Sequence, residues 1–160
     1  MVLLPQVVDA VNIPVIGAGG IADGRGIAAA FILGASAVQV GTRFLASEEC
    51  QIHENYKNAV IKAKDIDTVV TGRCTGHPVQ VLKNKLAKEY LKLEDNHVSI
   101  KELDELGKGA LRKAVIEGDT DNGSLMAGQI SGMVSKIQSV NEIIKEMFNE
   151  YEDIKVSFNS

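Results

Sequence analysis

Tryptophan is absent from the sequence, and aromatic residues make up only 4% of its 160 positions. The two cysteines, Cys50 and Cys74, are too few for a disulfide framework or a zinc site. The longest stretch without a charged side chain runs from Gly26 to Thr42. It has 17 residues, fewer than the roughly 20 apolar residues of a membrane-spanning helix. No positively charged segment precedes an apolar one at the N-terminus, as it would in a secretory signal. We therefore expect a soluble, cytoplasmic protein without a metal site.

A strong excess of one charge is also lacking. Seventeen basic side chains stand against 21 acidic ones, which gives a formal net charge of −4. A chain with this balance is not expected to bind nucleic acid or another polyanion. Hydrophobic residues make up 45% of the sequence, which excludes a disordered chain and fits one domain with a real core.

Glycine, in contrast, is plentiful, and several of the 15 glycines follow apolar runs. The runs Ile13–Gly17 and Ala37–Gly41 show no alternation, which is typical of strands buried on both faces of a parallel sheet. Between them the sequence predicts a helix over Arg25–Leu33, with Asp23 as its N-terminal cap. The first part of the chain is therefore predicted to be a βαβ unit with parallel strands.

Beyond Phe44 the sequence is mainly helical in pattern. A short extended piece is expected at Asp67–Thr71, and Ser139 with Glu142 forms a capping box at a helix start. We predict helices at Glu54–Lys64, Val79–Leu93, Leu103–Ile116, Ser124–Ser135 and Val140–Tyr151.

The glycine turn after the first strand admits three interpretations. It can be a tight turn that binds no ligand. It can be a dinucleotide site, because Gly17, Gly19 and Ala22 satisfy the G-x-G-x-x-A pattern. The acid that would bind the ribose of NAD is absent from the next strand, whereas Arg43 leaves an NADP site open.

The third interpretation uses the ends of both strands together. Gly19 and Gly20 follow the first strand, and Gly41 and Thr42 follow the second. Loops after the last two strands of a (β/α)₈ barrel commonly form a phosphate site. Glycine N–H groups, the Thr42 hydroxyl and the dipole of the following helix would all contribute to it. This interpretation accounts for both glycine clusters.

The segments 13–24 and 39–44 resemble the flavin-phosphate region of two related groups of FMN enzymes. These are the nitronate monooxygenases (2-nitropropane dioxygenases) and the flavin-dependent enoyl-acyl-carrier-protein reductases, called enoyl-ACP reductase II. The resemblance covers most of the chain and is closer to the reductases over 121–130. It continues through 53–57, 63–68, 76–79, 82–84, 109–111 and 123–130.

The resemblance implies a TIM (β/α)₈ barrel that holds FMN by its phosphate. In the reductases, NADH or NADPH reduces FMN, which passes a hydride to an enoyl thioester in fatty acid biosynthesis. In the monooxygenases, a nitronate reduces the flavin and O₂ oxidises it. The residues that match the cofactor-binding positions of the family are Gly19, Gly20, Gln39, Val40, Gly41 and Thr42.

A complete barrel needs about 250 residues, so the chain is expected to be the C-terminal portion of one. Residues 1–50 would supply its last βα units, and residues 51–160 a mainly helical extension that packs on them. The family's active-site histidine would lie in the missing part, so no catalytic residue is predicted here. Unpaired strand edges make an oligomer possible. The third functional alternative is a non-catalytic remnant that binds phosphorylated ligands.

Two further positions are expected near the substrate by the same resemblance. They are His77, within Gly76-His77-Pro78, and Gln129, within Met126-Ala127-Gly128-Gln129. The predicted helix 79–93 also carries four lysines against the single acid Glu89. They form either a solvated face or a docking site for an acidic acyl carrier protein. The four are Lys83, Lys85, Lys88 and Lys92.

Overall fold

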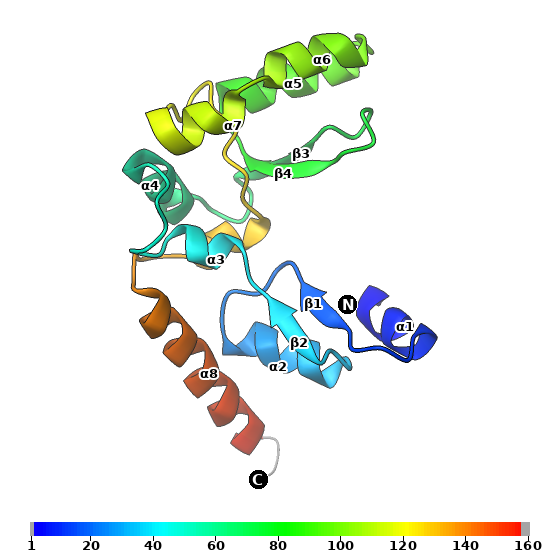
Figure 1. The fold of residues 1–160 in the computed structure, drawn as a ribbon, viewed down its shortest axis with the longest axis vertical. Coiled ribbons are helices and arrows are strands. Elements are labelled where there is room, and N and C mark those ends of the chain that lie inside the picture. The colour runs from blue at the N-terminus through cyan, green and yellow to red at the C-terminus, as the bar shows by residue number, and fades with distance from the viewer. Residues whose placement is uncertain (1, 158–160) are drawn as a thin grey trace.

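The computed structural model describes residues 2–157, and its first part is the predicted βαβ unit (Figure 1). Strands β1 and β2 pair in parallel, with Gly17 opposite Val38, and helix α2 connects them. The Asp23 side chain accepts a hydrogen bond from the Gly26 N–H at 3.1 Å, which confirms the predicted cap. The elements of this part are α1 (Leu3–Ala10), β1 (Ile16–Ala18), α2 (Gly24–Ile32), β2 (Ala37–Gln39) and α3 (Thr42–Leu45).

The second part adds an antiparallel hairpin to the helices. Strands β3 and β4 pair with Val69 opposite Val81, and α5 and α6 lie along one side of the hairpin (Figure 1). The extended piece expected at 67–71 is therefore confirmed as β3. The elements are α4 (Glu54–Lys62), β3 (Thr68–Thr71), β4 (Val79–Leu82), α5 (Lys85–Asp95), α6 (Ile100–Gly107), α7 (Ala110–Arg112), the π-helical turn η1 (Lys113–Glu117), the 3₁₀-helix η2 (Gln129–Met133) and α8 (Val140–Ser157).

The predicted helix 79–93 is wrong in its first third. Residues Val79–Leu82 form β4, and α5 begins only after Asn84, whose side chain accepts a hydrogen bond from the Ala87 N–H at 2.8 Å. The β-branched side chains of Val79 and Val81 favour a strand. The apolar spacing extends across the boundary, but the asparagine cap divides it into a strand and a helix.

Two other predicted helices are also corrected. The helix predicted over 103–116 is interrupted at Gly109, whose φ of +73° places it in the left-handed region. The helix predicted over 124–135 is mostly absent. Residues 124–128 are extended, because Met126 bridges Val81 across the hairpin and the Leu82 N–H donates to the Leu125 carbonyl. Only η2 is helical there.

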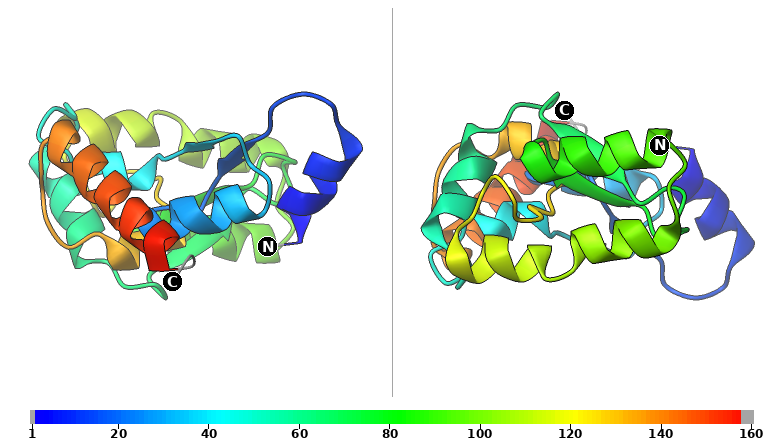
Figure 2. Two further views of the ribbon diagram at one scale, coloured as in Figure 1. Left: turned by 90° about the horizontal axis from the view of Figure 1, so that it is seen from below. Right: turned by 90° about the horizontal axis from the view of Figure 1, so that it is seen from above.

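Helix α8 returns to the first part of the chain and packs across α2 (Figure 2). Its predicted start is confirmed, since the Ser139 and Glu142 side chains accept hydrogen bonds from each other's backbone N–H groups. Ile143 and Met147 of α8 are buried in one core cluster with Ile27 of α2. Within residues 2–157, none of the helices combines the length and apolar composition needed to cross a membrane.

The crossing of α2 and α8 requires a glycine at position 24. A Cβ atom there would lie 2.4 Å from the backbone nitrogen of Tyr151 and 2.7 Å from Glu150. The Gly24 N–H also donates to the Glu150 carboxylate at 2.9 Å. Contact between the two backbones therefore fixes how α8 lies on the βαβ unit.

Replacing Gly24 by alanine should dislodge α8. We expect Gly24→Ala to lower the free energy of unfolding by about 1–3 kcal/mol, because the methyl group overlaps rigid backbone. Urea unfolding followed by circular dichroism measures this loss. Gly41→Ala is the matched control, since its Cβ would meet nothing within 4 Å. Equal stabilities of the two variants would contradict the assignment.

Candidate functional site

The two glycine loops lie at the same edge of the parallel sheet. Ala18, the last residue of β1, is opposite Gln39, the last residue of β2, so the chain leaves both strands side by side. Gly19 and Gly20 have φ angles of +91° and +71°, which side chains adopt rarely. A Cβ atom at Gly19, Gly20 or Gly41 would meet nothing within 4 Å. The loops thus present open backbone to whatever lies at this edge.

Hydrogen-bond donors in these loops are available to a ligand. Outside the strand pairing, no described residue accepts a hydrogen bond from the backbone N–H of Gly20 or Gly41. The Thr42 hydroxyl oxygen accepts a hydrogen bond from the Gly128 N–H at 3.0 Å. A hydroxyl group carries one donor besides its acceptor sites, so the Thr42 O–H remains free to donate. These groups suit the oxygens of a phosphate.

The expected contribution of the α2 dipole is not supported. The N-terminus of α2 is occupied by two carboxylates of the chain itself, because Asp23 accepts from Gly26 and Glu150 accepts from Gly24. Partial burial opposes ionisation of Asp23, but hydrogen bonds from Arg25 and Gly26 outweigh it and hold the pKa of Asp23 below its usual range. The N–H groups of Gly24 and Gly26 are therefore not available to a phosphate at this point.

Gln39 and Val40 differ in what they offer to this edge. The Gln39 side chain is exposed at the end of β2. Val40 packs against the apolar cluster around Ile27, so only its backbone faces a ligand. Gln129 lies close by, because it lines an open hollow of about 470 Å³ together with Gly20 and Lys64. The structure therefore brings Gln129 close to the first glycine loop.

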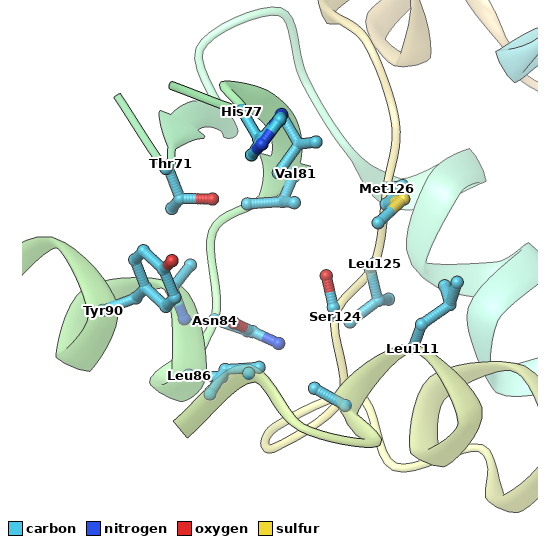
Figure 3. Close-up of a pocket in the computed structure, with 15 residues that line it drawn as sticks. Thr71, His77, Val81, Asn84, Leu86, Tyr90, Leu111, Ser124, Leu125 and Met126 are labelled. Atoms are coloured by element: carbon cyan, nitrogen blue, oxygen red, sulfur yellow. Dashed lines mark hydrogen bonds between the residues drawn. The ribbon is translucent and has the colours of Figure 1, made fainter. Parts of the chain in front are cut away.

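His77 is not brought to the same place. It is exposed in the turn between β3 and β4 and lines a separate pocket of about 180 Å³ beneath the hairpin (Figure 3). That pocket shares no lining residue with the hollow beside Gly20. Of the other histidines, His53 caps α4 by accepting from the Asn55 N–H, and His97 is exposed in a turn.

Comparison with known proteins gives the same family as the motifs. The model of the nitronate monooxygenase family matches residues 1–150. A probable nitronate monooxygenase of Staphylococcus saprophyticus is 35% identical over 149 residues, which is 91% of this chain and 42% of that protein. The chain belongs to the nitronate monooxygenase family. A probable nitronate monooxygenase of Staphylococcus aureus is 36% identical over 152 residues, or 95% of this chain and 42% of that protein.

Two solved structures also have the same three-dimensional fold as this chain over nearly its whole length. FabK from Thermotoga maritima superposes with a TM-score of 0.94 at 46% identity, over 99% of this chain and 50% of that one. A nitroalkane oxidase from Streptomyces ansochromogenes gives 0.80 at 30% identity, over 98% of this chain and 44% of that one. The chain spans less than half the length of the curated relatives it matches.

Two buried cations support the second glycine loop, and neither was predicted. Arg43 donates to the Gln138 side chain, and Lys57 Nζ donates to the Ser47 carbonyl at 2.7 Å. Burial lowers the pKa of Arg43. Both residues are over nine-tenths buried: Arg43 holds the turn after α3 against the segment before α8, and Lys57 holds it against α4. For Arg43 the sequence signal was its position directly after the uncharged stretch that ends at Thr42. The NADP role left open for it is not supported, because Arg43 is buried and donates to Gln138.

A negative charge at Gly41 should weaken the binding of a phosphate at the two glycine loops. Gly41 has φ of −108° and open space around it, so a side chain fits there. We expect Gly41→Asp to weaken FMN binding at least tenfold, because its carboxylate repels the phosphate at short range. Fluorescence titration gives the affinities. Gly41→Asn has nearly the same shape without the charge, and an equal loss in that variant would contradict an electrostatic cause.

Proposed function

We propose that this chain forms the flavin-phosphate portion of an FMN-dependent oxidoreductase built on a (β/α)₈ barrel. The observation that carries the proposal is the pair of open glycine loops at adjacent strand ends, with free N–H groups at Gly20 and Gly41. The β1–α2–β2 unit has the form of one barrel repeat. Ile16 of β1 is 60% exposed on the side away from α2, as expected of a strand that further strands or ligands cover.

The residues present fit FMN at this position. Gly19, Gly20, Gly41 and Thr42 would hold its phosphate, and Gln129 lines the adjoining hollow. When bound, FMN supplies the group that accepts and donates a hydride. The residues of this chain bind and orient the phosphate, and the Thr42–Gly128 hydrogen bond fixes the donor direction of the hydroxyl.

Within this class we propose an enoyl-ACP reductase that uses NADH or NADPH. The support is the higher identity to FabK, 46%, compared with 30% for the nitroalkane oxidase. A nitronate monooxygenase is the second candidate, because the family model and the curated relatives carry that name. A remnant that binds phosphorylated ligands without turnover is the third.

An FMN titration of the purified chain tests the phosphate site. We expect saturable quenching of flavin fluorescence that inorganic phosphate reverses. Riboflavin, which has the same ring system without the phosphate, should bind at least tenfold more weakly. Equal binding of FMN and riboflavin would reject a phosphate-directed site.

The loaded protein then separates the candidate reactions. Oxidation of NAD(P)H that depends on an enoyl thioester supports the reductase, and O₂ uptake with a nitronate supports the monooxygenase. FMN binding with neither turnover supports the remnant.

The lysines of α5 are proposed to dock an acidic acyl carrier protein. Lys85, Lys88 and Lys92 are exposed on α5 at spacings of three and four residues, so they share one face. No ion pair with these three is present among residues 2–157. Lys83, expected on the same helix, follows β4 instead, and its Nζ donates to the Ile66 carbonyl at 2.5 Å. We therefore omit Lys83 from the docking face.

Charge reversal on this face should weaken carrier binding. We expect Lys88→Glu with Lys92→Glu to reduce affinity for an acidic carrier protein at least tenfold at low salt, with a smaller effect at high salt. Surface plasmon resonance at two salt concentrations measures both. Lys145→Glu, an exposed reversal on α8, is the control, and an equal loss there would reject a local docking face.

A further inference from the structure

The pocket beneath the β3–β4 hairpin has mainly apolar walls and limited room. Its volume is about 180 Å³, and its walls include Val81, Leu86, Leu111 and Leu125 (Figure 3). An apolar cavity of about 150 Å³ is enough to hold benzene. The pocket therefore accommodates roughly six to eight non-hydrogen atoms.

Three hydroxyl groups line the same space. The oxygens of Thr71, Tyr90 and Ser124 face the centre of the pocket in Figure 3. No hydrogen bond joins any of these three hydroxyls to another of residues 2–157, and none of the three oxygens is fully buried. Burial, and then the Glu94 carboxylate, raise the pKa of Tyr90, so its hydroxyl keeps its proton. Accessible hydroxyls beside apolar walls favour a ligand that has hydrogen-bond acceptors as well as apolar groups.

Helix α5 connects this pocket with the cationic face. Leu86 and Tyr90 of α5 line the pocket, and Lys85, Lys88 and Lys92 of the same helix are exposed. A ligand attached to an acidic carrier on those lysines would therefore have to extend by only about one helix diameter, 10–12 Å, to enter the pocket.

The wall of the pocket opposite α5 belongs to the segment that continues to Gly128, beside the proposed flavin site (Figure 3). Ser124 and Met126 line the pocket, and the Gly128 N–H binds the Thr42 hydroxyl beside the glycine loops. Four extended residues span at most about 14 Å, so the wall of the pocket at Ser124 lies within about that distance of Gly128 beside the glycine loops.

We propose that this pocket binds the pantetheine arm that links an acyl group to a carrier protein or to coenzyme A. The arm combines amide carbonyls, which accept hydrogen bonds from the three hydroxyls, with methyl and methylene groups, which pack on the leucines. The pocket holds one amide and its flanking carbons. This inference rests on the proposed reductase function, because only a thioester substrate brings such an arm.

Calorimetric titration of the flavin-free chain with pantetheine tests the proposal directly. The variant Gly107→Leu should fill the pocket, because Gly107 is one of its lining residues. A Cβ atom at Gly107 would have the Tyr90 ring, at 3.8 Å, as its nearest neighbour, so the backbone has room for a side chain. We expect saturable pantetheine binding that this variant weakens at least tenfold. Lys101→Leu, exposed on the same helix, should leave it unchanged. Circular dichroism establishes that both variants fold.

Two shape-preserving variants test the hydroxyl groups. Thr71→Val and Tyr90→Phe should each weaken pantetheine binding about three- to tenfold and leave the binding of benzene, a purely apolar probe, unchanged. Absence of pantetheine binding, or equal pantetheine affinity in all variants, overturns the proposal. Tighter binding of benzene with no effect of the hydroxyl variants also overturns it, in favour of a hydrocarbon site.

The outcome is separable from that of the flavin proposal. FMN affinity of the same variants is measured in parallel and should not change, because no pocket residue lies in the glycine loops. Pantetheine binding without FMN binding refutes the flavin site and leaves the pocket assignment supported. FMN binding without pantetheine binding refutes only the pocket assignment.

Discussion

The hydrogen bond from the Gly128 N–H to the Thr42 hydroxyl joins the two parts of the chain on which the candidate site depends. Thr42 begins α3 at the second glycine loop, and Gly128 ends the extended segment that follows Ser124. The same segment is fixed from two other sides. Met126 bridges Val81 of the hairpin, and the Tyr56 hydroxyl of α4 donates to the Met126 carbonyl at 2.8 Å. Burial raises the pKa of Tyr56 to about 12, so this donor persists at any physiological pH. Displacement of the segment would alter the glycine loops and the hairpin pocket together.

Electrostatics then decides where in the βαβ unit an anion is tolerated. A helix N-terminus after a glycine turn is ordinarily an anion site, but here Asp23 and Glu150 already occupy that of α2. Because Glu150 belongs to α8, the helix that closes the fold also excludes the phosphate from α2. The open N–H groups of Gly20 and Gly41 and the Thr42 hydroxyl lie beyond the strand ends, away from that cap. The open donors of this unit therefore lie in the two loops rather than at the N-terminus of α2.

Features set by neighbouring residues were predictable from the sequence, and those set by distant ones were not. The parallel βαβ unit, the Asp23 cap and the Ser139 capping box follow from local patterns and were confirmed. The helix predicted over 124–135 failed, because residues 124–128 pair with β4, some 45 positions earlier in the chain. The hydrogen bond from the Gly24 N–H to Glu150 joins residues 126 positions apart, so no local pattern encodes it. For the site, the spacing of the glycines indicated the two loops. Gln129 was expected near the substrate only from the family resemblance, and no local pattern encodes its position beside Gly20.

Contacts among residues 2–157 set the geometry of the two glycine loops. β1, α2 and β2 set the positions of Gly20 and Gly41, and their pairing register is defined by three consecutive residue pairs. The turn after α3 is held by the buried cations Arg43 and Lys57, whose desolvation would be unfavourable unless this packing were retained. Arg43 ties this turn to Gln138 in the segment before α8, and Lys57 ties it to α4. The strand ends, the turn after α3 and Gly128 all lie in the described part of the chain, and their contacts with one another set the geometry of the two glycine loops.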